Sequence, residues 1–326
     1  MLVRTAIVTG IYGQDGTLLA KHLLDKGYRV VGIAPTLKPE MNHRLQTYCG
    51  DFEILGSDLL QDGQISNLLD KYSPSEIYNL AGLSQILECE ADAASAFRVN
   101  TELPLKFLNI LAGTNIRFYQ ASSSEIFGNC KVGVQNEETF VNPRNIYGIT
   151  KAAAHHAVGH YRMQYNVFAC SGIMYNHESE FRGDGLVTSK IIDNLIRIKF
   201  TSDKTKFSLG NIDSKRDWGF AGDYVKAMWM MLQQEVAADF VVATNSVHSV
   251  RDLLISALNF LELNDDLQSY VNIDEKLVRQ NENGILQGDY TKIKSKLGWE
   301  PSMNFDSLVQ YLIEAKSPKI NANPKC

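Results

Sequence analysis

The first half of the chain alternates short, β-rich apolar runs with amphipathic segments of helical period. Six runs are predicted strands: RTAIVTG, YRVVGIA, FEILGSD, SEIYNLAG, IRFYQASS and VFACSGIMY. Four segments are predicted helices: GTLLAKHLLDKG, ISNLLDKY, the stretch around LPLKFLNILAG, and Tyr147 to Tyr165. Strands that alternate with helices favour an α/β fold built on a doubly wound parallel sheet of the Rossmann type.

The pattern loosens beyond Tyr175. There NHESEFRGDG predicts a loop, LVTSKIIDNLIRIKF an amphipathic helix, FVVAT a late buried strand, FDSLVQYLIEA a helix, and SPKINANPKC a frayed tail. We expect a Rossmann domain from residues 1–175 plus about 208–246. A smaller C-terminal α/β domain for the substrate would use about 176–207 plus 247–326.

Composition narrows the function classes. The 326 residues are 44% hydrophobic and carry a formal net charge of -5, which argues mildly against nucleic acid or anionic membrane as a partner. Five cysteines stand singly, without the spacing of a zinc or disulfide framework. The chain opens directly on a predicted strand, and its apolar runs are too short to span a bilayer. A cytoplasmic protein without a metal site is expected.

A glycine motif directly follows the first strand. TGIYGQDG places Gly10, Gly13 and Gly16 where the first helix opens. Such glycines let the backbone approach a pyrophosphate, and the helix N-terminus offers N–H groups and partial positive charge. A turn without a ligand is the alternative, but the strand–turn–helix context favours a dinucleotide.

The choice between NAD and NADP rests on weaker signals. The second strand ends GIAP, without the acid typical of NAD readers or the arginine typical of NADP readers. Thr36, Lys38 and Arg44 follow, either to meet a 2′-phosphate or as a solvated loop, and we favour NADP with NAD possible. Asp58, after the third strand, is a candidate for the adenine amino group or a helix N-cap.

Tyr147 and Lys151 stand at i and i+4 in IYGITK, on one helix face. Oxidation of an alcohol by hydride transfer releases a proton, which a tyrosinate can accept. Lowering the tyrosine pKa from about 10 to about 7 takes roughly 4 kcal/mol, for which an ammonium and the nicotinamide charge are candidate sources. The alternative is an ordinary surface pair, but the glycine motif favours catalysis.

The chain resembles the GDP-mannose 4,6-dehydratase family of extended short-chain dehydrogenases/reductases. The resemblance runs from Thr5 to about Glu314, on the stretches GQDGTLLAKHLL, EIYNLAG, FYQASSSEIFG, GIMYNHES, NIDSKRDWGFAGDYVKAMWMML, HSVRDL, LQGDYTKIKSKLGWEP and FDSLVQ. It implies that Ser123, where the family has threonine, positions the sugar, and that Glu125 is the base that removes the C5 proton. A solvated loop acid is the alternative for Glu125.

The resemblance also implies ligand contacts. Cofactor contacts are expected at Gly10, Tyr12, Gly13, Gln14, Asp15, Gly16, Asp58, Leu59, Leu80, Ala81, Gly82, Ser84, Tyr147, Lys151, His177 and Arg182. Contacts to a GDP-sugar are expected at Ser84, Ser123, Glu125, Asn176, Lys190, Arg216, Arg251, Arg279 and Glu282. Each arginine could instead form a surface salt bridge.

Departures from the family pattern leave alternatives open. Leu83 and Gln85 replace Gln and His, Phe181 falls where the family is Pro/Arg-rich, and Ala34-Pro35 replaces an arginine pair that touches the NADP phosphate and a neighbouring subunit. A homo-oligomer, dimer or tetramer, is expected. GDP-manno-heptose is an alternative substrate. A keto-sugar reductase or epimerase, and an NADP-binding sensor without turnover, are the remaining alternatives.

Overall fold

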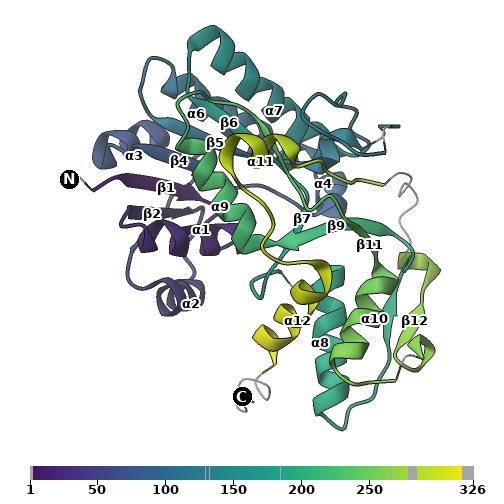
Figure 1. Cartoon of the computed structure of the whole chain (residues 1–326). Helices are drawn as coiled ribbons and strands as arrows, with labels where there is room; N and C mark the ends of the chain where they lie inside the picture. Colours follow the sequence, from purple (N-terminus) through teal and green to yellow (C-terminus); the bar gives the residue numbers. More distant parts are fainter. Residues whose placement is uncertain are drawn as a thin grey trace.

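A seven-stranded parallel sheet forms the body of the molecule (Figure 1). The computed structural model describes residues 3–128, 130–131, 133–183, 185–264, 266–277 and 285–317. The strand order is β10-β6-β5-β4-β1-β2-β3, and each pairing in it is parallel. The strands span Thr5–Thr9 (β1), Arg29–Ala34 (β2), Glu53–Gly56 (β3), Glu76–Asn79 (β4), Arg117–Ser123 (β5), Ala169–Met174 (β6) and Phe240–Val242 (β10). The predicted Rossmann sheet, including the late strand in FVVAT, is confirmed.

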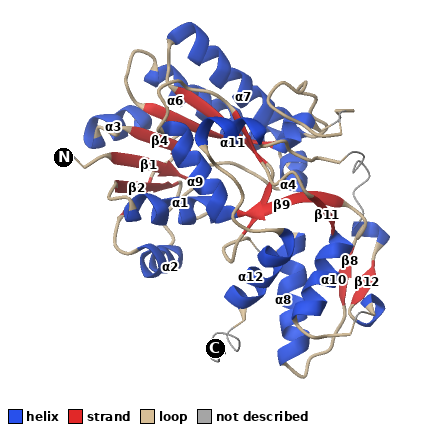
Figure 2. Ribbon diagram, in the orientation of Figure 1, coloured by secondary structure: helices blue, strands red, loops and turns tan. Residues whose placement is uncertain are grey.

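Helices cover both faces of this sheet (Figure 2). On one face, α1 (Gln14–Asp25) and α9 (Ala221–Leu232) share a core with Tyr78 and Tyr119, and α2 (Pro39–Cys49) contacts α1. On the other, α3 (Gln64–Tyr72), α6 (Leu103–Leu111) and α7 (Ile146–Tyr165) bury side chains such as Leu68, Phe107 and Val158. Short turns α4 (Ile86–Ala91), α5 (Ala93–Phe97) and a π-helix (Arg98–Glu102) precede α6. The sheet is therefore doubly wound.

A second apolar core lies below the large sheet in Figure 1. It joins α8 (Val187–Phe200), α10 (Val250–Phe260) and α12 (Phe305–Lys316) to the pair β8 (Phe207–Leu209) and β12 (Val271–Ile273). Single-turn helices flank β12 at Leu267–Ser269 and Glu275–Leu277. A small sheet with the strand order β11-β9-β7 lies between the two cores (Figure 1). Its strands are Val247–Ser249 (β11), Lys215–Phe220 (β9) and Asn176–Glu178 (β7).

Several local predictions need correction or completion. The stretch NHESEFRGDG is not all loop, because its first three residues form β7 and pair in parallel with β9. Helix α11 (Thr291–Leu297) contacts β10, and its Ile293 is buried in the first core. The predicted domain boundaries stay a prediction. Most of the tail SPKINANPKC lies outside the described residues.

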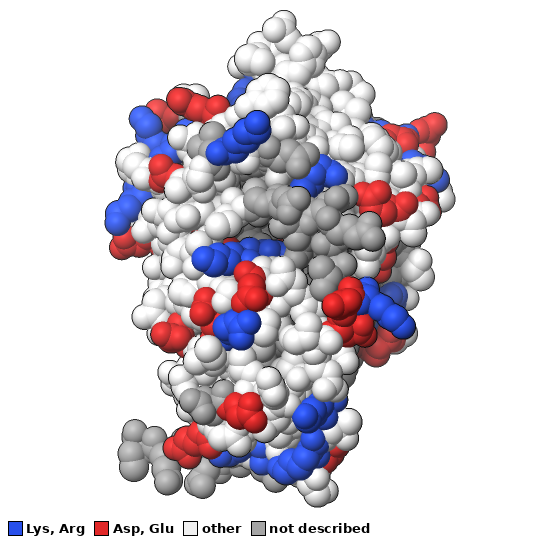
Figure 3. Space-filling view, turned by 90° about the vertical axis from the view of Figure 1, so that its right-hand side faces the viewer, with Lys and Arg blue, Asp and Glu red and all other residues white. Residues whose placement is uncertain are grey.

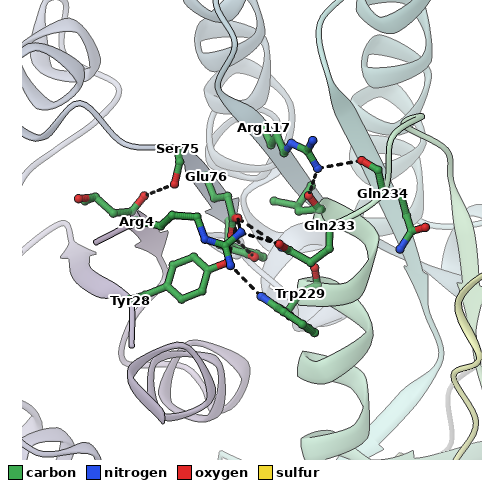
Figure 4. A network of polar contacts seen from close by, with 11 residues as sticks. Arg4, Tyr28, Ser75, Glu76, Arg117, Trp229, Gln233 and Gln234 are labelled. Atoms are coloured by element: carbon green, nitrogen blue, oxygen red, sulfur yellow. Dashed lines mark hydrogen bonds and ion pairs between the residues drawn. The ribbon is translucent and has the colours of Figure 1, made fainter. Parts of the chain in front are cut away.

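A buried carboxylate stabilises the sheet at the opposite end of β4 from the glycine loop (Figure 4). Glu76 is 2% exposed and accepts hydrogen bonds from Tyr28 (3.0 Å), Tyr78 (2.7 Å) and Gln233 (3.3 Å), while Arg4 lies 3.3 Å away. Because a buried charge needs such partners, this network joins β4 to the residues that precede β1 and β2 and to the C-cap of α9. Burial raises the pKa of Tyr28 to about 12, so its hydroxyl stays a donor.

Candidate active site at the carboxyl edge of the sheet

The carboxyl ends of β1, β4 and β5 bring the predicted motifs together. The glycine loop follows β1, the turn Leu80 to Ser84 follows β4, and the serine run with Glu125 follows β5. These three strands are neighbours, and the strand order reverses direction at β1. Ligands of doubly wound sheets bind at this kind of switch point.

The glycine loop has the form of a pyrophosphate cradle. Gly10 has φ +67°, and a Cβ on it would lie 2.8 Å from the Leu80 carbonyl carbon, so only glycine fits there. Gly13 is the N-cap of α1 and offers no side-chain cap, while Gly16 lies in the first turn. The first-turn N–H groups therefore lack intrahelical partners and can meet an anion. These residues fit a dinucleotide.

Tyr147 and Lys151 project from the first two turns of α7 toward the end of β5. Lys151 is 5% exposed, donates to the Ala121 carbonyl oxygen at 3.0 Å, and lies 5.9 Å from the Tyr147 ring centre. Burial lowers the pKa of Lys151 to about 8. Burial raises the pKa of Tyr147 to about 12, while Ser123 and Arg182 act to lower it and Glu125 to raise it.

The Tyr–Lys spacing predicts a lowered tyrosine pKa. With the described residues alone, the pKa of Tyr147 is raised instead. The Lys151 ammonium lies 5.9 Å from the Tyr147 ring centre and donates to the Ala121 carbonyl oxygen. A tyrosinate at neutral pH therefore needs additional positive charge beside the phenol, such as an oxidised nicotinamide would supply if bound there.

Ser123 and Glu125 lie between the sheet and α7. The Ser123 Oγ accepts the Glu125 N–H at 3.2 Å and also interacts with the Tyr147 phenol. These residues open a single 3₁₀ turn, Ser124–Phe127. The Glu125 side chain is 18% exposed and accepts a hydrogen bond from Asn145 at 2.8 Å, with Arg144 at 3.6 Å. This held position contradicts the alternative of a solvated loop acid.

A buried polar ladder connects the glycine loop to Lys151. Thr9, Asn79 and Gln120 are paired in register across β1, β4 and β5, and none is more than 1% exposed. Thr9 donates to Asn79 at 2.7 Å, Asn79 to Gln120 at 2.8 Å, and Gln120 to the Ala121 carbonyl at 3.0 Å. That carbonyl also accepts from Lys151, so the ladder fixes the position of the ammonium. The Thr9 hydroxyl accepts from Leu80 and Ala81 N–H groups, which sets the turn after β4.

The side chains of Gln14 and Asp15 contact β7. Gln14 donates to the His177 carbonyl at 3.0 Å, and Asp15 contacts the His177 Nε2 at 2.9 Å. Burial alone would raise the pKa of Asp15 and lower that of His177, but their mutual attraction leaves the pKa of Asp15 lowered and that of His177 raised. Arg182 forms an ion pair with the buried Glu178 at 3.2 Å. This cluster fixes the entry of α1 against the small sheet.

The flank of the glycine loop that faces α2 is polar and aromatic. The Tyr12 hydroxyl donates to Asn42 at 2.5 Å, and exposed Arg44 donates to the Tyr12 carbonyl at 3.2 Å. The Arg44 guanidinium lies 5.6 Å from the Phe181 ring centre. Asp58 is exposed and accepts from the Leu60 N–H at 3.1 Å, so it stabilises a turn; the N-cap of α3 is Gly63. Leu59 is buried beneath that turn.

The predicted substrate contacts are placed more widely. Ser84 is exposed beyond β4, Asn176 begins β7, Lys190 lies on α8 and Arg216 on β9. Arg251 forms an exposed ion pair with Asp213 at 2.9 Å, so its salt-bridge alternative describes this structure. Arg279 and Glu282 lie outside the described residues.

The comparisons with known proteins decide the family. The model of the GDP-mannose 4,6 dehydratase family matches residues 7–312. The chain is 39% identical to GDP-mannose 4,6 dehydratase 1 of Arabidopsis thaliana, covering 98% of this chain and 93% of the relative. It is 36% identical to GDP-mannose 4,6 dehydratase of Homo sapiens with the same coverage. The chain belongs to the GDP-mannose 4,6-dehydratase family. The recognition made from its motifs is confirmed.

Solved structures agree on the fold of this family member. The dTDP-glucose 4,6-dehydratase of Bacillus anthracis, in complex with NAD, matches with a TM-score of 0.81 at 15% identity, covering 96% of each chain. RMD from Pseudomonas aeruginosa, complexed with NADPH, matches with a TM-score of 0.78 at 20% identity, covering 96% of this chain and 98% of that one. At such identities the likeness shows the fold, the extended short-chain dehydrogenase/reductase architecture.

Other features of this dehydratase-family chain concern metals and membranes. Within the described residues, no group of three or more His, Cys, Asp or Glu side chains is placed to hold a metal ion. The helices of the described ranges include none with the length and apolarity to cross a membrane. On the face shown in Figure 3, the described Lys and Arg side chains are interspersed with Asp and Glu.

Proposed function

We propose that the chain converts GDP-mannose to GDP-4-keto-6-deoxymannose, with a bound NADP that would supply the hydride acceptor for sugar C4 and the hydride donor for C6. The observation that supports this most is that two separate candidate proton acceptors, Tyr147 and Glu125, both contact Ser123. A simple reductase, or a 4-epimerase that works by hydride transfer alone, needs no base to remove a C–H proton. The family membership supports the same reaction.

Tyr147 takes the C4 hydroxyl proton as the hydride leaves that carbon. The Tyr147 phenol forms a hydrogen bond with Ser123, and in the proposed reaction Ser123 also orients the C4 hydroxyl of the sugar. Burial raises the pKa of this phenol to about 12, so the positive charge of the oxidised nicotinamide, together with Arg182, is needed to form tyrosinate. Proton loss is thereby linked to the presence of the cofactor in the form that accepts a hydride.

Glu125 acts once C4 is a ketone. The ketone acidifies the C5–H bond, and Glu125 removes that proton while the C6 hydroxyl leaves as water. Return of the hydride to C6 and of a proton to C5 completes the 4-keto-6-deoxy sugar. Hydrogen bonding to Asn145 and attraction to Arg144 hold the carboxylate in one orientation for this step.

NADP is the proposed cofactor over NAD because of Arg44. Its guanidinium lies beside the Tyr12 carbonyl and the Phe181 ring, on the flank of the glycine loop that faces α2, the proposed adenosine side, and is exposed. A planar guanidinium binds phosphate in bidentate fashion. Arg44→Ala should weaken binding of NADPH more than binding of NADH, measured by titration of nicotinamide fluorescence; equal weakening would contradict this role.

Assembly and location remain proposals. We expect a homo-oligomer, dimer or tetramer, in the cytoplasm, with a GDP-sugar as the substrate partner. Light scattering of the purified protein measures the oligomer directly.

Mass spectrometry tests the proposed reaction. Purified protein is incubated with NADP⁺ and either GDP-mannose or GDP-manno-heptose, and Glu125→Gln is run in parallel. The proposal predicts loss of one water from GDP-mannose by the wild type only. Loss from the heptose alone would move the substrate, and Leu83 and Gln85 after β4 would be the first positions to exchange. Loss from neither sugar would refute the proposal.

A further inference from the structure

Asn145 contacts both the proposed base and the helix that carries Tyr147. Its Oδ1 accepts the Gly148 N–H at 2.7 Å as the N-cap of α7. Its Nδ2 donates to Glu125 Oε2 at 2.8 Å. Only this orientation of the amide is chemically consistent, because the reverse would place its oxygen against a carboxylate and its NH₂ against an N–H donor.

The two contacts require a hydrogen-bond acceptor and a hydrogen-bond donor in the side chain of residue 145, and the asparagine amide supplies both. Serine, aspartate and asparagine are all good N-cap residues, since each presents an oxygen to the first-turn N–H groups. Serine is too short to cap and reach the carboxylate together, and aspartate has no N–H to donate to it. Capping alone therefore does not explain why residue 145 is asparagine, whereas capping combined with a hydrogen bond to Glu125 does.

The surrounding backbone makes the coupling stiff. A Cβ on Gly148 would lie 2.5 Å from the Glu125 carbonyl oxygen, so the first turn of α7 is pressed against the residue that it helps to hold. Arg144 faces Glu125 Oε1 at 3.6 Å, with its side chain 11% exposed. A shift of α7 would therefore move Tyr147 and Glu125 together.

We infer that Asn145 is a positioning residue for the dehydration step, holding the Glu125 carboxylate toward sugar C5 and fixing its distance from Tyr147. This inference rests on the proposed function. It adds that the chain separates two tasks: Tyr147 supports oxidation at C4, and the Asn145–Glu125 contact supports proton removal at C5. Loss of the amide donor should therefore slow the second step and spare the first.

The test separates these two steps in the full-length protein. Wild type and Asn145→Ser are mixed with GDP-mannose and NADP⁺ in deuterated water. The reduced nicotinamide formed reports C4 oxidation, and deuterium incorporated at C5 reports the base. Serine keeps the capping oxygen and removes the donor. Asn304→Ser is the matched control, because exposed Asn304 accepts the Ser307 N–H at 2.9 Å as the N-cap of α12, a helix of the second core.

Asn145→Ser should keep C4 oxidation within about twofold of wild type and slow C5 exchange by about ten- to a hundredfold, the range for a misplaced catalytic group. Asn304→Ser should leave both unchanged. Equal loss of both steps in Asn145→Ser would overturn the inference, because a purely structural cap disturbs Tyr147 as well. Unchanged exchange would also overturn it. Wild type that oxidises C4 without losing water would instead refute the proposed dehydration, and this inference with it.

Asn145→Asp adds a readout that a structural role would not move. It keeps a good cap but places a second carboxylate beside Glu125, which disfavours the charged form of the pair. Among the described residues, the charged or titratable groups Arg144 and Tyr147 face Glu125, and Glu90 on α4 accepts the neighbouring Ile146 N–H at 2.9 Å. The low-pH limb of C5 exchange should move to higher pH in Asn145→Asp. An unmoved limb would contradict the contact.

Discussion

Lys151→Met should stabilise the protein at neutral pH while it abolishes activity. The Lys151 side chain is buried, and burial lowers its pKa from 10.5 to about 8. At about 1.36 kcal/mol per unit of pKa, the charged form in the folded state is disfavoured by about 3 kcal/mol relative to the unfolded chain. Methionine has similar length and no charge, and the Ala121 carbonyl keeps its hydrogen bond from Gln120.

Loss of the lysine hydrogen bond offsets about 1 kcal/mol of this gain, which leaves a net stabilisation of about 2 kcal/mol. The sign of the pH dependence follows from proton binding. Between pH 8 and 10.5 the unfolded chain holds a proton that the folded protein has released, so wild-type stability rises with pH and the advantage of the variant shrinks. Below pH 8 both states are protonated and the full difference remains.

Urea unfolding midpoints at neutral pH and at about pH 10 measure this difference. Lys71→Met, which changes a mostly exposed side chain, is the control. A Lys151→Met variant less stable than wild type at neutral pH, or a difference that does not shrink with rising pH, would refute the reasoning. The same variant should fail to oxidise sugar C4, because it removes a buried ammonium 5.9 Å from the ring centre of Tyr147, the proposed acceptor of the C4 hydroxyl proton.

Three further substitutions test the supporting structure. Gln120→Leu breaks the buried ladder and should lower the unfolding free energy by about 1–3 kcal/mol and slow C4 oxidation, measured by urea unfolding and reduced-nicotinamide formation. Asp217→Ala should lower the unfolding free energy by about 3 kcal/mol or more, because the Asp217 carboxylate accepts hydrogen bonds from the N–H groups of Thr244, Asn245 and Gly288. Burial raises the pKa of Asp217 to about 6, so the contribution of this residue to stability falls as the pH rises from 3.8 to 6. Glu76→Ala should destabilise by several kcal/mol in calorimetry yet leave turnover per folded molecule unchanged, because its network lies at the far end of the sheet.

The alternation of strands and helices was enough to predict the large sheet, because most of its strands are β-rich runs that are buried on both faces, although the edge strand β3 is only partly buried. It was not enough for α9, because AGDYVKAMWMML ends in the continuous apolar run AMWMML, in which a single helix face does not stand out. Strands β7, β8, β11 and β12 have three residues each, too few for an alternating pattern to stand out. Their pairing depends on tertiary contacts.

The candidate site also contains some residues that the sequence predicts and others that it does not. Tyr147, Lys151 and Glu125 are readable in sequence because their motifs are local and carry ionisable groups. Asn79 and Gln120 sit inside strands 41 residues apart, and nothing local signals that they bond side by side. Asn145 looks like an ordinary cap, and its contact with Glu125 appears only when α7 is packed against the end of β5.

The central claim is that Tyr147 and Glu125 serve two consecutive proton transfers in one dehydration. The most direct measurement is a single-turnover experiment with Glu125→Gln, NADP⁺ and GDP-mannose, following reduced nicotinamide and product mass together. The account predicts that reduced nicotinamide forms and persists while the sugar keeps its water. Normal loss of water by this variant, or failure to oxidise C4 with an otherwise intact fold, would contradict it.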